Sequence, residues 1–132
     1  MSDQDKLNIL IIDDNDISRA MLRFILSSVQ RYKVVGEAAN GAQGLAMTEK
    51  LHPAVVCLDV MLPDTNGVEL LKKIKEQWPE IAVLMVTGSN DADTVRTAVQ
   101  GGAAGYIVKP FNPATLLGTM EKAEAKLRAR PG

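Results

Sequence analysis

Short apolar runs recur along the chain, and each has the length of a buried β-strand. Most of them lack the polar and apolar alternation of a half-exposed strand, which is expected when both faces of a sheet are covered. The pattern therefore predicts strands at Ile9–Ile12, which could begin at Leu7, and at Val34–Ala38, Ala54–Leu58, Ile81–Val86 and Tyr106–Val108.

Between these runs the apolar spacing changes to the period of a helix. The first predicted helix carries an apolar face of Ile17, Met21, Phe24 and Ile25, and the last carries one of Leu116, Met120, Ala123 and Leu127. We expect the methionines of the chain interior to fill the core: Met21, Met47, Met85 and Met120.

The other helices are delimited by residues that cap or break a helix. Asn40 is a suitable cap for a helix that ends at His52-Pro53. A third helix is expected to stop near Trp78-Pro79, and a fourth at Gly101-Gly102. Asn112-Pro113 has the form of a cap followed by proline in the first helical turn, so it predicts the start of the last helix.

A strand followed by a helix, repeated five times, predicts an α/β fold. We expect a doubly wound, five-stranded parallel sheet in the flavodoxin-like order 2-1-3-4-5, with helices on both faces. The 132 residues fit a single domain with a core at about 7–127, and we expect no output domain.

The composition is that of an ordinary globular protein, with 46% hydrophobic and 23% charged residues and a formal net charge of −1. Lys and Arg are scattered, so we expect no direct contact with nucleic acid. No apolar run is long enough to span a bilayer, and the polar N-terminus does not resemble a signal peptide. Cys57 is the single cysteine and lies in an apolar run, so we expect a buried thiol and a cytoplasmic protein without membrane contact.

Polar residues directly follow four of the five predicted strands: Asp13 and Asp14, Asp59, Thr87 and Lys109. In an open α/β sheet the carboxyl ends of the strands form the edge at which ligands bind. Neighbouring strands lie about 4.8 Å apart, so the acids of the first and third strands should converge. Lys109 would be two strands away from Asp59, roughly 10 Å, which a long side chain can span.

Three carboxylates at close quarters require a compensating positive charge, and oxygen ligands alone suit Mg²⁺ or Mn²⁺. A carboxylate, a hydroxyl, an ammonium and a metal together meet the needs of phosphoryl transfer, in which negative charge spreads over three equatorial oxygens. We therefore expect a carboxylate that acts as nucleophile and forms an acyl phosphate.

These residues resemble the response regulator receiver domain of two-component phosphorelay signalling, over about Leu7 to Leu127. The resemblance rests on the acidic pair Asp13-Asp14, the segment DVMLPDTNG at 59–67, Thr87, and the segment YIVKPF at 106–111. Each motif alone is weak, whereas all of them in order at strand ends are specific.

The resemblance implies a role for each matching residue. Asp59 would be the phosphoacceptor, and the metal would be held by Asp13, Asp14, Asp59 and the backbone carbonyl of Met61. Lys109 would contact the phosphoryl group. The bond between Lys109 and Pro110 would be cis, an isomer that is uncommon even before proline.

Thr87 and Tyr106 would form the switch pair of such a domain. After phosphorylation the Thr87 hydroxyl would move to a phosphoryl oxygen and the Tyr106 ring would turn inward. The face made by helix 4, strand 5 and helix 5 would then change for a downstream effector protein. The donor would be a sensor histidine kinase or a phosphotransfer protein, and the chain would be a phosphoacceptor switch, not an enzyme, although it assists its own phosphorylation and dephosphorylation.

In this family the positions of Met61 and Ser89 tune the phosphoryl lifetime. Apolar Met61 cannot hydrogen-bond an attacking water, so we expect that dephosphorylation is not fast. Two other functions remain open at this point. A flavodoxin-type redox protein has the same strand order, but the three aspartates of the Asp-Asp-Asn-Asp run after the first strand would repel a flavin phosphate. A degenerate receiver could act as a constitutive interaction module, but it would lack one of the acids, the threonine or the lysine.

Overall fold

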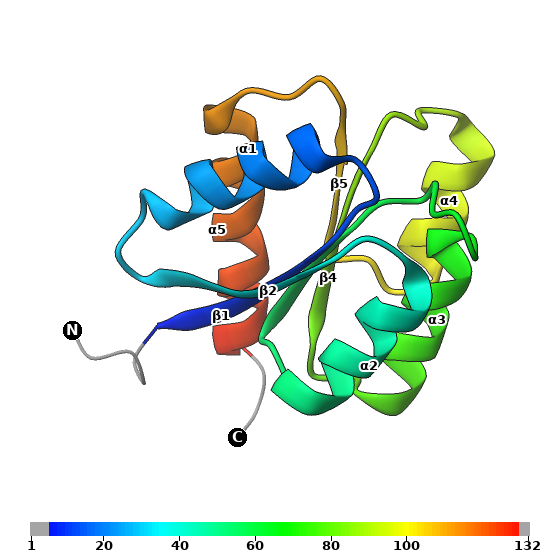
Figure 1. Ribbon diagram of the computed structural model, residues 1–132, viewed down its shortest axis with the longest axis horizontal. Coiled ribbons are helices and arrows are strands. Elements are labelled where there is room, and N and C mark those ends of the chain that lie inside the picture. The colour runs from blue at the N-terminus through cyan, green and yellow to red at the C-terminus, as the bar shows by residue number, and fades with distance from the viewer. Residues whose placement is uncertain (1–5, 130–132) are drawn as a thin grey trace.

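The computed structural model describes residues 6–129, and the ends at 1–5 and 130–132, including most of the polar N-terminus, lie outside the described part. Strands and helices alternate along the chain, as Figure 1 shows. Their bounds are β1 Leu7–Ile12, α1 Asp16–Ser27, β2 Tyr32–Ala38, α2 Gly41–Leu51, β3 Val55–Leu58, α3 Gly67–Gln77, β4 Ala82–Thr87, α4 Ala92–Gln100, β5 Gly105–Val108 and α5 Pro113–Ala129.

The strands form one parallel sheet in the order β2-β1-β3-β4-β5, which confirms the predicted fold class and strand order. Each predicted strand is present, with ends that differ by one or two residues. The largest difference is at β2, which begins at Tyr32 because Tyr32 and Lys33 pair with the first residues of β1.

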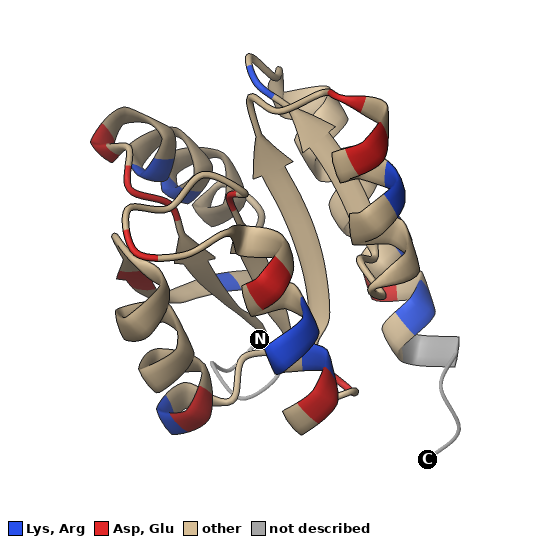
Figure 2. Ribbon diagram, turned by 90° about the vertical axis from the view of Figure 1, so that its right-hand side faces the viewer, with Lys and Arg blue, Asp and Glu red and all other residues tan. Residues whose placement is uncertain are grey.

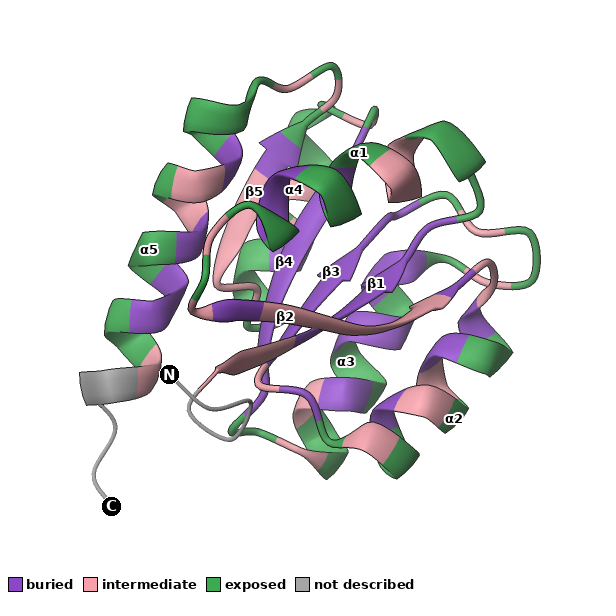
Figure 3. Cartoon of the chain, turned by 60° about the vertical axis from the view of Figure 1, so that its left-hand side comes forward, coloured by how far each residue is buried: buried purple, intermediate pink, exposed green. Residues whose placement is uncertain are grey.

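The sheet separates two apolar cores. Helices α1 and α5 cover one face and helices α2, α3 and α4 cover the other (Figures 1 and 3). Neighbouring residues of a strand enter opposite cores: Ile11 lies with Leu22 and Met120 on the first side, and Ile12 lies with Leu71 on the second. This double burial explains why the central strands are apolar without alternation.

Side chains cap the helices where the sequence predicts it. Asn40 accepts a hydrogen bond from the backbone N–H of Gln43 at the start of α2, and Asn112 accepts one from Thr115 at the start of α5. The predicted ends of α2 and α4 are also correct, because His52 takes a left-handed backbone conformation and Gly101 follows the last residue of α4.

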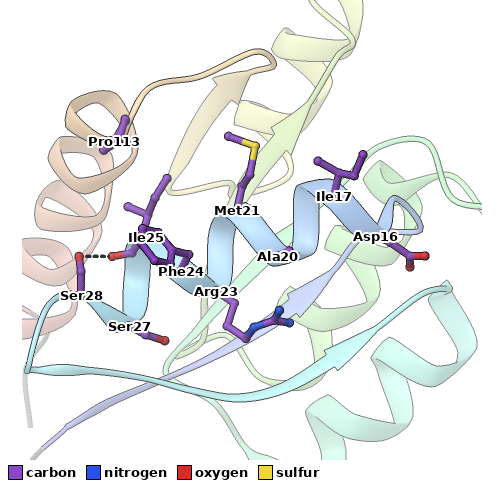
Figure 4. A pocket seen from close by; sticks show the side chains of 10 residues that line it. All are labelled: Asp16, Ile17, Ala20, Met21, Arg23, Phe24, Ile25, Ser27, Ser28 and Pro113. Carbon is purple, nitrogen blue, oxygen red and sulfur yellow. Dashed lines mark hydrogen bonds between the residues drawn. The ribbon is translucent and has the colours of Figure 1, made fainter.

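The apolar face predicted for α1 is wrong in most of its members. Ile17 and Phe24 are 71% and 79% exposed, and Met21 is not a core residue, whereas Leu22, Ile25 and Leu26 are buried. The helix has apolar residues on more than one face, so spacing alone does not show which face meets the sheet. Figure 4 shows the side chains of Ile17 and Met21 projecting from α1, with Pro113 of α5 lying on the side of Ile25 at the other end of the same open pocket.

Charged residues of both signs are interspersed along the helices (Figure 2). Within residues 6–129, no helix is both long and apolar enough to cross a membrane.

Candidate functional site

Strand register brings the first two acids of the site together. Ile12 and Leu58 are partners in the β1–β3 ladder, so Asp13 and Asp59, the next residues, leave the sheet at the same level. The backbone N–H of Asp59 continues the ladder by donating to the carbonyl of Ile12 at 3.0 Å. Both side chains are nearly buried, at 1% and 6% exposure. The predicted convergence of the acids is confirmed.

Lys109 reaches these acids from the end of β5. Its Nζ lies 2.7 Å from Oδ2 of Asp13 and 2.9 Å from Oδ2 of Asp59, so the expected gap of two strands is closed by the long side chain. The peptide bond between Lys109 and Pro110 is cis, as expected.

The surroundings of Asp13 and Lys109 shift the pKa of each. Burial raises the pKa of Asp13 above its usual range, although hydrogen bonds from Lys109 and from the backbone of Asn15 oppose the shift. Burial alone would lower the pKa of Lys109, but hydrogen bonds and charge from Asp13 and Asp59 outweigh it, so that pKa is raised. Lys109 is therefore a firmly protonated ammonium at neutral pH.

Asp14 completes an acidic cluster at the surface. Carboxylate oxygens of Asp13, Asp14 and Asp59 lie within 4.8 Å of one another, and Asp14 is the exposed member. Three carboxylates face one ammonium from Lys109, so the cluster has an excess of negative charge and an open side toward solvent. This donor set of hard oxygens fits a divalent cation such as Mg²⁺.

The β3–α3 loop carries Met61 past the acids. Its backbone N–H donates to Oδ1 of Asp59 at 3.1 Å, and its side chain is 68% exposed. Gly67 closes the loop, and a Cβ there would lie 2.0 Å from the carbonyl oxygen of Asp59, so only glycine fits. The start of α3 therefore packs directly against the backbone of Asp59.

Thr87 and Tyr106 lie on the next two strands. Thr87 is fully buried as the last residue of β4, and its hydroxyl accepts a hydrogen bond from the backbone N–H of Ser89 at 3.3 Å. The half-buried Tyr106 donates its hydroxyl to the carbonyl of Ser89 at 2.6 Å. The predicted switch residues thus share one short segment, the β4–α4 loop. A Cβ at Gly88 in that loop would meet no other atom within 4 Å, so the entrance beside Thr87 is open.

Two residues near the site were not singled out as functional from sequence. Arg19 donates to the carbonyl oxygen of Asp13 and also pairs with Asp16. Asp64 is exposed, and its carboxylate accepts hydrogen bonds from two backbone N–H groups of α2. The position of Arg19, four residues after the helix cap Asn15, is only a weak indication that its side chain contacts the site. The partners of Asp64 are too far away in the sequence for any local pattern to indicate them.

Residues 9–121 match the family described as the response regulator receiver domain. The nitrate/nitrite response regulator protein NarL of Escherichia coli is 37% identical over 125 residues, which are 95% of this chain and 58% of that protein. The chemotaxis protein CheY of Thermotoga maritima is 32% identical over 86% of this chain and 94% of its own length.

Solved structures agree with these matches. A CheY-like receiver domain from Methanospirillum hungatei superimposes with a TM-score of 0.86 at 31% identity, covering 93% of this chain and 97% of that one. Several other curated relatives carry names of transcriptional regulators, and the chain spans about half the length of those proteins.

Proposed function

Because the chain belongs to the response regulator receiver family, we propose that it is a phosphoacceptor switch of two-component signalling in which Asp59 receives a phosphoryl group. The donor is a sensor histidine kinase or a phosphotransfer protein. The observation that carries this proposal is the contact of one ammonium, that of Lys109, with the carboxylates of both Asp13 and Asp59 at the carboxyl edge of the sheet.

The reaction needs little beyond positioning and charge. A carboxylate oxygen of Asp59 attacks the phosphorus of a phosphohistidine, the new O–P bond forms and the P–N bond breaks. The electron pair of that bond stays on the imidazole nitrogen, which takes up a proton from solvent. Lys109 already contacts the nucleophile, and its ammonium can transfer one hydrogen bond to a phosphoryl oxygen as charge develops there.

The acidic cluster is the proposed binding site for Mg²⁺, or Mn²⁺ in its place. Its protein ligands would be the carboxylates of Asp13, Asp14 and Asp59 and the backbone carbonyl of Met61. When bound there, a divalent cation would supply positive charge to the phosphoryl oxygens. Asp59 is modified by each transfer and must lose its phosphoryl group before it can react again, so we class the protein as a switch and not as an enzyme.

The exposed apolar face of α1 supports docking of a protein donor. Ile17, Met21 and Phe24 form an open apolar groove with Pro113 of α5, and α1 begins directly after the acids of the site (Figure 4). Because Asp59 is only 6% exposed, a donor histidine must approach it from the open side of the site. The surface of the donor protein around that histidine would then contact the start of α1. We expect Phe24→Ser to slow transfer from a phosphotransfer domain of the same genome, with phosphorylation by acetyl phosphate unchanged.

We propose that Thr87 and Tyr106 convert phosphorylation into output. The Thr87 hydroxyl would exchange its hydrogen bond with Ser89 for one with a phosphoryl oxygen. That exchange moves the loop on which the Tyr106 hydroxyl also rests, and so changes the α4–β5–α5 face for a downstream effector protein. On this proposal the chain works in the cytoplasm through protein partners, without itself contacting nucleic acid or membrane.

Phosphorylation by acetyl phosphate with Mg²⁺ tests the proposal. Intact-mass measurement should show one added phosphoryl group on the wild type and none on Asp59→Asn or without the metal. Beryllofluoride should bind under the same conditions. A wild type that gains no mass and binds no beryllofluoride would instead support a degenerate receiver that acts as a constitutive interaction module, and a bound yellow chromophore would support the flavodoxin-type alternative.

A further inference from the structure

The loop between β3 and α3 is fixed at its base. The backbone N–H of Gly67 donates to the carbonyl of Val60 at 2.7 Å, and Met61 pairs with Asn66 as an isolated antiparallel bridge. Residues 62–65 therefore form the tip of a narrow turn. Met61, whose carbonyl is a proposed metal ligand, lies on one arm of this turn between base and tip.

The tip of the turn is fastened to a different helix. Oδ1 of Asp64 accepts from the backbone N–H of Gly41 at 2.7 Å, and Oδ2 accepts from Ala42 at 2.9 Å. These N–H groups belong to the first turn of α2, which has no acidic residue of its own there. The two hydrogen bonds lower the pKa of Asp64, so its carboxylate is fully charged at neutral pH. This negative charge also interacts favourably with the positive end of the α2 helix dipole.

The contact between tip and helix is close. A Cβ at Gly41 would lie 2.4 Å from Cγ2 of Thr65 and 3.2 Å from Oδ1 of Asp64. Gly41 thus allows the turn to rest directly on the backbone of α2, and the Asp64 carboxylate joins the two segments across 23 residues of sequence.

We propose that Asp64 is a positioning residue that holds the carbonyl of Met61 in place for the divalent cation. The Met61 side chain is largely in solvent and gives its backbone little anchorage, so the base and the tip of the turn determine where that carbonyl lies. Half-buried Leu62 packs against the apolar core, and the Asp64 carboxylate adds two directional hydrogen bonds to the backbone of α2. The inference rests on the proposed function, since the metal is part of it.

The test compares Asp64→Ala with Asn40→Ala. Both variants remove a side-chain acceptor from the N-terminus of α2, because Asn40 accepts from Gln43, but Asn40 is not part of the β3–α3 loop. We expect the Mg²⁺ dissociation constant, measured by calorimetry, to rise about tenfold in Asp64→Ala and to stay within about twofold in Asn40→Ala. Asp64→Asn keeps one acceptor oxygen and should fall between wild type and Asp64→Ala.

Hydrogen exchange in the metal-free protein supplies a second readout. Amides at 60–67 should exchange faster in Asp64→Ala than in Asn40→Ala, with equal protection of the central strands in both. Equal losses of Mg²⁺ affinity in the two variants, or unchanged exchange at 60–67, would reduce Asp64 to a cap of α2 and overturn the proposal. Failure of the proposed function is distinguishable, because the wild type itself would then neither bind Mg²⁺ nor accept a phosphoryl group.

Discussion

Two groups of buried acid lie at opposite edges of the same sheet, and their charges are balanced differently. At the carboxyl edge, Asp13 and Asp59 share the single ammonium of Lys109, with Asp14 beside them. At the amino edge, Glu124 of α5 is 6% exposed and meets the guanidinium of Arg31 at 3.0 Å and the hydroxyl of Tyr32.

This difference in charge balance distinguishes a structural contact at the amino edge from a candidate binding site at the carboxyl edge. Glu124 has a cation and a phenol donor beside it, and it joins α5 to the start of β2 with its charge matched. The carboxyl edge has more acids than cations among these side chains and an exposed acid on its open side. We infer that Glu124 at the amino edge is balanced by Arg31 and Tyr32, whereas the acids at the carboxyl edge keep an excess of negative charge that could hold a divalent cation.

Removing the cation of the carboxyl edge should have the largest effect on stability. In Lys109→Met, Asp13 and Asp59 are left buried without their ammonium, so we expect the metal-free free energy of unfolding to fall by about 3 kcal/mol. Mg²⁺ should restore part of this loss. Denaturant unfolding with EDTA and with Mg²⁺ measures both values, and a loss that Mg²⁺ does not reduce would contradict the comparison.

Removing the acid of the amino edge should cost less and should not respond to metal. Glu124→Gln takes a charged acceptor from Arg31 and Tyr32, and Arg31 is partly exposed, so we expect a loss of about 2 kcal/mol. The same unfolding experiment checks it. Rescue of this variant by Mg²⁺, beyond the effect on the wild type, would show that the two edges are not independent.

Neutralising an acid of the carboxyl edge should leave the metal-free protein nearly unchanged. Asp13→Asn removes a carboxylate whose pKa burial already raises, so we expect the free energy of unfolding in EDTA to stay within about 1 kcal/mol of the wild type. Mg²⁺ should then stabilise the variant much less than it stabilises the wild type. A large metal-free loss would assign a structural role to this acid as well.

The smallest effect concerns alkaline pH. Burial, followed by the nearby Glu124, raises the pKa of Tyr32 in the folded state, so the unfolded chain loses the phenol proton first. Wild-type stability should therefore fall as pH rises above about 10, by up to about 1 kcal/mol for one pH unit. Tyr32→Phe should lack this component, while the contributions of Tyr106 and Lys109 remain in both proteins. If the stability of Tyr32→Phe fell with rising pH in parallel with that of the wild type, the contact between Tyr32 and Glu124 would not be the source of this pH dependence.

Sequence reasoning predicted the carboxyl edge well because strand ends and parallel register convert local position into proximity. Asp13 and Asp59 follow paired strand residues, so their meeting depends only on the strand order. The tie between Arg31 and Glu124 was not predicted, since its partners are 93 residues apart and neither belongs to a motif.

The same limit applies to the exposed face of α1 and to Asp64. The apolar residues of α1 cover a wide arc of the helix, so their spacing does not show which part of that arc is buried. Phe24 was therefore assigned to the apolar face, whereas the buried Leu22 was not recognised. Asp64 joins a loop to a helix by accepting hydrogen bonds from backbone N–H groups. Every residue type except proline carries such a group, so the sequence does not indicate which residues are its partners.

The single thiol of the chain has a practical consequence. Cys57 lies in β3 at 1% exposure, and burial raises its pKa to about 12, so it offers maleimide reagents neither access nor thiolate while the sheet is intact. A cysteine introduced on α4 or α5 would then take a fluorophore or spin label alone, without removal of the native residue. Cys57 itself would react only after the sheet opens, so its labelling rate would measure the rate of global unfolding.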